Sequence, residues 1–208
     1  MVRRARRLTP VGSGNGQVDG GVRLFVAILL DETVRASLAK VQAELAARCR
    51  GVRWVSREQL HVTLKFLGDV PDSRVAAVGQ RVAEAAQTTE PFELELGGCG
   101  CFPPRGAARI VWAGFREQPQ ALARCVEALE SNLEREEFAR EGRPFSSHVT
   151  IGRVRDDASG GGLRAVVAAA RLSSVAQTVR SIALMSSVLS PAGPTYSVVH
   201  SAVIGQGG

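Results

Sequence analysis

Two stretches of the chain, LHVTLKFLG at residues 60–68 and SHVTIGRV at residues 147–154, repeat one pattern of apolar and polar residues. In the first stretch the two kinds alternate, which predicts a half-buried β-strand with one polar face. Its apolar positions are Leu60, Val62, Leu64 and Phe66, and its polar positions are His61, Thr63 and Lys65. The second stretch places His148 and Thr150 in the same way. The copies lie too far apart for neighbouring units of a stacked repeat, so they predict two similar strands flanking one groove of a duplicated domain.

The segments around these strands predict an α+β domain with antiparallel sheets. Apolar residues three and four apart predict helices over 34–45, 75–85 and 122–137, and a short helix from residue 163 follows a glycine loop. Strands are predicted over 23–30, 60–67, 92–96, 109–115 and 148–154, with an antiparallel hairpin over 178–189 and 194–204. Residues 97–108 are expected to form a loop. No glycine-rich phosphate loop lies between a strand and a helix, so nothing supports nucleoside-triphosphate hydrolysis or NAD chemistry.

The charge of the chain favours an anionic partner. The 208 residues carry a formal net charge of +6, but four arginines against one aspartate in residues 1–20 supply part of it. This distribution predicts a local basic groove rather than a broad nucleic-acid coat. We expect residues 1–20 to be a disordered basic, glycine-rich tail and residues 21–205 to form a single domain. No run has the pattern of a secretory leader or a membrane span, so we expect a cytoplasmic protein that does not contact a membrane.

The four cysteines give weak evidence for metal or redox chemistry. Cys99 and Cys101 form the only close pair, and a lone C-x-C has no paired metal-ligand spacing. We expect free thiols packed in or near the core, with no disulfide framework.

Two histidines facing one another can cleave a phosphodiester without a metal. One activates the nucleophile and the other protonates the departing oxygen, and the ordinary pKa of histidine, about 6.5, leaves both forms populated near neutrality. Thr63 and Thr150, on the faces of their histidines, can donate hydrogen bonds to phosphate oxygens. Lys65 and Arg153 are candidates for further positive charge. Strict alternation turns Arg153 away from His148 and Thr150, so it needs a β-bulge or a strand end to reach the groove.

With these residues the chain resembles the two-histidine (2H) phosphoesterases, in the RNA 2′,3′-cyclic phosphodiesterase branch historically called 2′-5′ RNA ligases. The likeness covers RLFVAILLDETV (23–34), WVSREQLHVTLKFLGDV (54–70), CFPPRGAARIVWAGF (101–115), RPFSSHVTIGRV (143–154) and LMSSVLSPAGPTYSVV (184–199). It implies a bilobed, pseudo-twofold α+β fold in which two antiparallel sheets flank a central cleft with helices on the outside.

The resemblance also implies an activity and roles for residues. Terminal 2′,3′-cyclic phosphates of RNA would be hydrolysed to 2′-phosphates without a metal or other cofactor, with reversible 2′-5′ ligation as a further reaction. His61 would be the general acid and His148 the general base, and Arg153 matches the arginine that ends the second motif. Relatives commonly carry proline directly before the second histidine, where this chain has Ser147. We expect a monomer with no obligatory protein partner.

For several residues a structural interpretation remains open beside a functional one. Phe102 is a candidate to stack on a nucleobase, and plain packing explains it as well. Trp54 and Trp112 are expected in the core, and His200 lacks a threonine two residues on, so we expect it to be structural or exposed. Two other functions remain open: a three-histidine zinc site made by His61, His148 and His200, and an RNA-binding module without catalysis.

Overall fold

The computed structural model describes residues 20–156, 162–191 and 193–205. The expected tail of residues 1–20 therefore lies, except for Gly20, outside the described residues. The helices are α1 (Glu32–Ala46), α2 (Val75–Gln87), α3 (Gln120–Glu134) and α4 (Leu163–Ala168). The strands are β1 (Gly21–Leu29), β2 (Val52–Trp54), β3 (His61–Pro71), β4 (Phe92–Phe102), β5 (Ile110–Phe115), β6 (His148–Val154), β7 (Ala176–Val179), β8 (Ser181–Ser190) and β9 (Gly193–Val203). Single 3₁₀ turns occupy Arg57–Gln59 and Asp72–Arg74.

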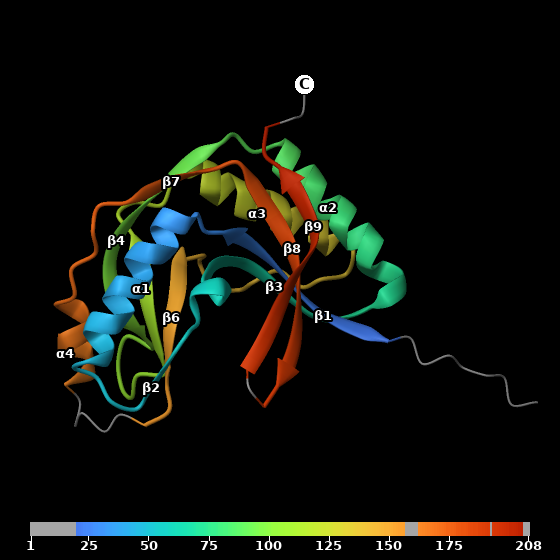
Figure 1. Cartoon of the computed structure of the whole chain (residues 1–208). Coiled ribbons are helices and arrows are strands. Elements are labelled where there is room, and N and C mark those ends of the chain that lie inside the picture. Colours follow the sequence, from blue (N-terminus) through green and yellow to red (C-terminus); the bar gives the residue numbers. More distant parts are fainter. Residues whose placement is uncertain (1–19, 157–161, 192, 206–208) are drawn as a thin grey trace, which may run out of the picture.

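In this part of the chain the strands join into one antiparallel nine-stranded sheet (Figure 1). Its order is β7-β4-β5-β6-β3-β1-β8-β9, with β2 paired to β6 beside this path. The expectation of two separate sheets is therefore wrong, although the two histidine strands are indeed central. β3 and β6 are joined by a single residue pair, Val62 with Val149. The backbones on either side of this pair diverge, so the sheet curves around the place where the two motifs meet.

The helices pack on one face of the sheet, as their apolar spacing predicts. The buried apolar side chains of all four helices belong to one core cluster with Leu24, Val26 and Ile28 of β1. The opposite face of β1 carries Phe25 and Ala27, which form a separate small cluster with residues of β8. Because side chains alternate along a strand, the helix-covered face and the histidine face of the sheet are distinct.

β4 is longer than the sequence predicted. Residues 97–102, part of the expected loop, continue the strand, and residues 99–102 pair with β5. The indole of Trp112 occupies the space beside Gly100, where a Cβ would lie 2.3 Å from a ring atom. Glycine therefore lets the tryptophan pack across the strand, and pairing with β5 overrides the weak intrinsic strand preference of this segment.

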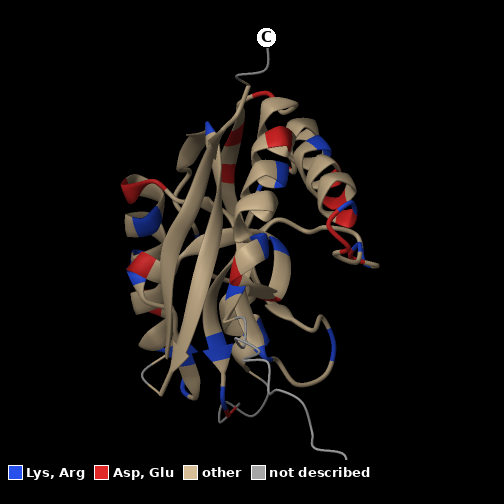
Figure 2. Cartoon of the chain, turned by 90° about the vertical axis from the view of Figure 1, so that its right-hand side faces the viewer, with Lys and Arg blue, Asp and Glu red and all other residues tan. Residues whose placement is uncertain are grey.

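The predicted C-terminal hairpin is confirmed. β8 and β9 pair from Ser181 with Val203 to Ser190 with Gly193, and the end of β8 and the start of β9 lie at the bottom of Figure 1. The charged residues are unevenly placed: Figure 2 shows mostly Lys and Arg at the lower ends of the strands and both signs along the helices. Within the described residues, no helix combines the length and apolarity needed to cross a membrane.

Candidate active site

The two predicted histidines lie on the adjacent central strands and line one cavity of about 310 Å³. His61 begins β3 and His148 begins β6, and each directly precedes one member of the Val62–Val149 pair that joins the strands. The valines point into the helix-covered core, so the histidines point to the other face. The structure therefore brings both motifs to one place.

Each imidazole is held by the same local hydrogen bond. Nδ1 of His61 lies 2.7 Å from the carbonyl oxygen of Gln59, and Nδ1 of His148 lies 2.8 Å from that of Ser146. A carbonyl oxygen only accepts, so Nδ1 carries the hydrogen and donates in both rings. This fixes the tautomer, so that Nε2 is the nitrogen of each neutral ring that can accept a proton.

The threonines line the same cavity as their histidines. The Thr63 hydroxyl lies 3.1 Å from Nε2 of His61 and donates to it when the ring is neutral. Thr150 stands opposite Trp112 in the β5–β6 ladder and is half-buried. Both hydroxyls are thus placed where an oxyanion between the histidines could accept from them.

Arg153 reaches the cavity through a β-bulge. The β5–β6 register passes from Trp112 with Thr150 to Val111 with Gly152, so Ile151 is the extra residue. This shift returns Arg153 to the histidine face, where it lines the cavity. The bulge is held from behind, because Nε2 of Gln42 on α1 donates to the carbonyl oxygen of Ile151 at 2.7 Å.

The predicted placement of Lys65 on the histidine face is wrong. Leu64 is an extra residue in β3, since the register with β1 passes from Ala27 with Thr63 to Val26 with Lys65. Lys65 therefore turns toward the helices, where its ammonium lies 2.6 Å from Glu130 and 2.8 Å from the carbonyl oxygen of Ala139. It is buried and neutralised by Glu130, which leaves it no role at the phosphate.

The same bulge exposes Phe66, which alternation had placed in the core. Its side chain is 73% exposed, and it lines the cavity beside Thr63. A large exposed aromatic at this position offers a flat apolar surface to a ligand.

Aromatic rings support each histidine, and sequence reasoning missed most of them. Phe25 of β1 lies 5.0 Å from the His61 ring centroid, and Phe102 lies 5.0 Å from that of His148. Tyr196 of β9 meets His61 edge-on at 5.3 Å. Phe102 also contacts Trp112 at 5.4 Å, so packing against the histidine and the tryptophan accounts for it. Phe25 falls in a predicted strand, but nothing in the sequence specifies its pairing with β3.

Burial lowers the pKa of His61. Desolvation disfavours its imidazolium form, and the positive charges of Arg153 and His148 lower the pKa further, while the hydrogen bond to the Gln59 carbonyl opposes the shift. An anion between the histidines would act in the opposite sense and favour a proton on His61.

Trp54, expected in the core, is half-buried and lines the cavity, whereas His200 and the cysteines do not line it. His200 packs against α2, where a Cβ on Gly79 would lie 3.6 Å from its ring, so the three histidines do not form a zinc site. Within the described residues, no group of three or more His, Cys, Asp or Glu side chains is arranged to hold a metal ion. Cys49, Cys101 and Cys125 are buried and Cys99 is half-buried, as expected for side chains packed in or near the core. Burial raises the pKa of the Cys99 thiol to about 11, which makes it a poor nucleophile.

At Ser147 the backbone does what proline could not. Its N–H lies 3.3 Å from Oε1 of Gln118 and donates to it. The chain entering β6 is thus held by a hydrogen bond that a proline at this position could not donate.

Paired histidines and threonines around an anion-sized cavity define a phosphoesterase-type site. Comparisons with known proteins agree. A family model described as LigT like Phosphoesterase matches residues 28–112. An RNA 2′,3′-cyclic phosphodiesterase of Archaeoglobus fulgidus is 34% identical over 176 residues, covering 84% of this chain and 96% of that protein. One of Methanothermobacter thermautotrophicus is 32% identical over 177 residues, covering 85% and 95%.

Solved structures share the fold. The crystal structure of TT0787 of Thermus thermophilus matches with a TM-score of 0.77 and 29% identity, covering 88% of this chain and 98% of that one. The chain therefore belongs to the LigT-like phosphoesterase family, and the resemblance found in its sequence is confirmed.

Proposed function

We propose that this protein is an RNA 2′,3′-cyclic phosphodiesterase that yields a 2′-phosphomonoester by two-histidine acid–base catalysis. The observation that carries the proposal is the matched pair of imidazoles, which line the same cavity and each donate from Nδ1 to a backbone carbonyl, so that Nε2 is the nitrogen that exchanges a proton. The names of the curated relatives support the substrate class.

In the proposed step, His148 is the general base and His61 the general acid. Nε2 of His148 takes a proton from water as the water oxygen bonds to phosphorus. The bond from phosphorus to O3′ breaks, and Nε2 of His61 gives its proton to that oxygen. The products are a 2′-phosphate and a 3′-hydroxyl, and the two histidines have exchanged protonation states. The next turnover requires a proton to return from solvent to His61.

The lowered pKa of His61 has a role in the proposed mechanism. Free His61 is mostly neutral near pH 7 because burial disfavours the imidazolium, and the anionic cyclic phosphate raises its pKa on binding. The acid is therefore charged mainly when substrate is present. The hydroxyls of Thr63 and Thr150 donate to the non-bridging oxygens, and Arg153 adds a planar cation as negative charge builds up.

Other parts of the proposal concern the whole protein. A pseudo-twofold duplication is supported by the two central strands, which carry the same residues and the same histidine–carbonyl bond. We propose a cytoplasmic monomer that needs no protein partner, and 2′-5′ ligation as the reverse of the same step. A binding module without catalysis remains the competing function, because it would use the same basic cavity.

The test is turnover of a short RNA ending in a 2′,3′-cyclic phosphate, with EDTA present. We expect one product that co-elutes with the authentic 2′-phosphate. His61→Ala and His148→Ala should each reduce kcat about 10²-fold or more. A protein that binds this RNA without converting it would be the binding module, and activity that vanishes in EDTA and returns with zinc would refute the metal-free mechanism.

A further inference from the structure

A buried glutamine on α1 braces the strand that carries the second motif. Gln42 is 7% exposed, and it is the one polar side chain among the buried residues of α1, a helix that the structure describes in full. Its Nε2 donates to the carbonyl oxygen of Ile151 at 2.7 Å and to that of Val55 at 2.8 Å. An amide nitrogen carries two hydrogens, so both are used in holding these carbonyls. The brace therefore joins α1 to β6 and to the residue that follows β2.

The carbonyl group of Ile151 lies at the β-bulge. Ile151 is the residue that the register with β5 skips, and its carbonyl oxygen accepts from the Val55 N–H at 3.0 Å as well as from Gln42. Two residues later the chain reaches Arg153, which lines the cavity because the bulge has returned it to the histidine face. Gln42 thus holds the backbone at the point that decides which face of the sheet Arg153 occupies.

An apolar side chain at position 42 would avoid the cost of burying an amide. The other buried residues of α1 are Val34, Leu38, Val41 and Leu45, and a leucine would complete their stripe. A buried amide is tolerated when its hydrogen bonds are made, and here both donors bind backbone. Gln42 lies behind the sheet and outside the lining of the cavity, so it does not touch a ligand bound there. Any effect of this side chain on the reaction is transmitted through the backbone that it holds.

We infer that Gln42 is a positioning residue of the active site, which acts on the reaction through Arg153. The inference rests on the proposed function, in which the Arg153 guanidinium meets the negative charge that builds up on the phosphate. With the brace in place, the guanidinium is held in position before the substrate binds. Without it, the bulge can relax toward regular pairing with β5, which turns Arg153 from the cavity toward the helix-covered face. A displacement of about 1 Å already costs a reacting group much of its effect.

Gln177 of β7 provides a matched control. Its side chain is 6% exposed, and its amide also makes two backbone hydrogen bonds, with the Asp31 N–H at 2.8 Å and with the Leu29 carbonyl oxygen at 3.1 Å. Neither partner belongs to β6, so Gln177→Met removes an equivalent pair of bonds and leaves the bulge in place. Gln42→Met likewise keeps an unbranched side chain of similar length and removes both donors.

The experiment is a double-mutant cycle of each glutamine with Arg153, measured as kcat/KM on a short RNA ending in a 2′,3′-cyclic phosphate. We expect Arg153→Gln alone to lower kcat/KM about 10- to 100-fold, as for the loss of hydrogen bonds to a charged group. Gln42→Met should lower it about tenfold in the wild type and at most about twofold in Arg153→Gln. Gln177→Met should lower it at most about twofold in both backgrounds. Equal losses from Gln42→Met in both backgrounds would overturn the inference, because a general loss of structure does not depend on Arg153.

An NMR titration of His61 in the free protein tests the placement of Arg153 without turnover. Burial lowers the pKa of His61, and the charge of Arg153 lowers it further, so Arg153→Gln should raise the midpoint. Gln42→Met should raise it in the same direction, and Gln177→Met should leave it unchanged. These shifts in a protein that converts no RNA would refute the proposed function and uphold the positioning role.

The opposite result separates the two claims as clearly. A raised midpoint in Arg153→Gln with none in Gln42→Met would overturn the positioning role of Gln42 and leave the activity intact. If Gln42→Met does not fold, Gln42→Asn takes its place, because its shorter side chain withdraws the amide from both carbonyls. The same results are then expected, and the same results would overturn the inference.

Discussion

Glu130 is the only acidic partner found for the buried Lys65 among the described residues, so its removal has a large predicted cost. The two side chains are 6% and 9% exposed, with Nζ and Oε2 2.6 Å apart. At this distance and an effective dielectric constant of about 20, their attraction is about 6 kcal/mol. Glu130→Gln leaves the ammonium buried with no counter-charge, and breaking such a pair costs about 3–5 kcal/mol. Because the amide still offers an acceptor oxygen, we expect a loss near 3 kcal/mol.

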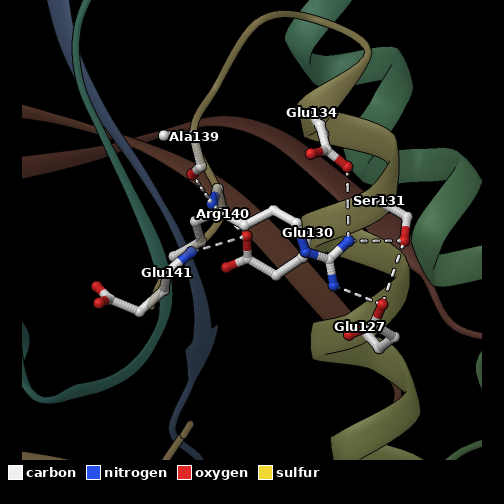
Figure 3. Close-up of polar contacts among 8 residues, drawn as sticks. Glu127, Glu130, Ser131, Glu134, Ala139, Arg140 and Glu141 are labelled. Carbon is white, nitrogen blue, oxygen red and sulfur yellow. Dashed lines mark hydrogen bonds and ion pairs between the residues drawn. The ribbon is translucent and has the colours of Figure 1, made fainter. Parts of the chain in front are cut away.

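A matched control lies one turn earlier on the same helix. Figure 3 shows Glu127 and Glu134 meeting Arg140, while Glu130 points to the backbone of Glu141. The Glu127–Arg140 pair is exposed on both sides, so Glu127→Gln should not measurably change stability. The double variant Lys65→Met with Glu130→Leu removes both buried charges and should return to within about 1 kcal/mol of the wild type.

Urea unfolding followed by circular dichroism measures these free energies. The pair also anchors residues 139–141, and the same loop supplies the Ser146 carbonyl that holds His148. We therefore expect kcat to fall severalfold in Glu130→Gln and to stay low in the double variant, which regains stability but loses both contacts to this loop. Equal stability of Glu130→Gln and Glu127→Gln would refute the reasoning, as would a double variant no more stable than Glu130→Gln.

Three further predictions concern the site. In an NMR titration of the free protein, His61 should titrate below the ordinary value of about 6.5, and inorganic phosphate should raise its midpoint; a free midpoint at or above 6.5 contradicts the burial argument. Because the unfolded chain then binds more protons, this histidine lowers the free energy of unfolding as the pH falls below about 6.5. Phe66→Ala should raise KM for an RNA substrate about tenfold with little change in kcat, since stacking one base contributes about 1–3 kcal/mol; an unchanged KM excludes the stack. His200→Gln should keep kcat/KM within a few-fold of the wild type. If His200→Gln were as inactive as His61→Ala, His200 would have to take part in the reaction, which would contradict its placement outside the cavity.

Sequence periodicity predicted those parts of the fold that depend on local pattern. The buried faces of the helices follow from apolar residues spaced three and four apart, and the C-terminal hairpin follows from two strand-like segments separated by a turn sequence. The two His-Thr pairs were found because each pair is two residues apart on a strand, and the structure places them together. Counting along the second motif predicted that Arg153 needs a β-bulge or a strand end to reach the groove, and the structure contains the bulge.

The features of the fold and site that the sequence did not predict depend on pairing between strands that are distant in the chain. The bulge at Leu64 depends on the register with β1, which exchanges the faces of Lys65 and Phe66 in a way that alternation cannot reveal. Phe25 and Tyr196 reach His61 from two other strands, so their role depends on sheet order. The nine strands form one sheet through a single residue pair, and nothing in either motif specifies that junction.

The division of labour between the histidines is tested most directly by replacing the bridging 3′ oxygen of the substrate with sulfur. A thiol is several pK units more acidic than an alcohol, so the departing sulfur needs little help from an acid. The measurement is kcat/KM of His61→Ala and His148→Ala on the oxygen and sulfur substrates. The proposed mechanism predicts that sulfur restores much of the rate lost in His61→Ala and none of that lost in His148→Ala, because water still lacks its base. Rescue of His148→Ala in place of His61→Ala would contradict it and reverse the roles of the two histidines.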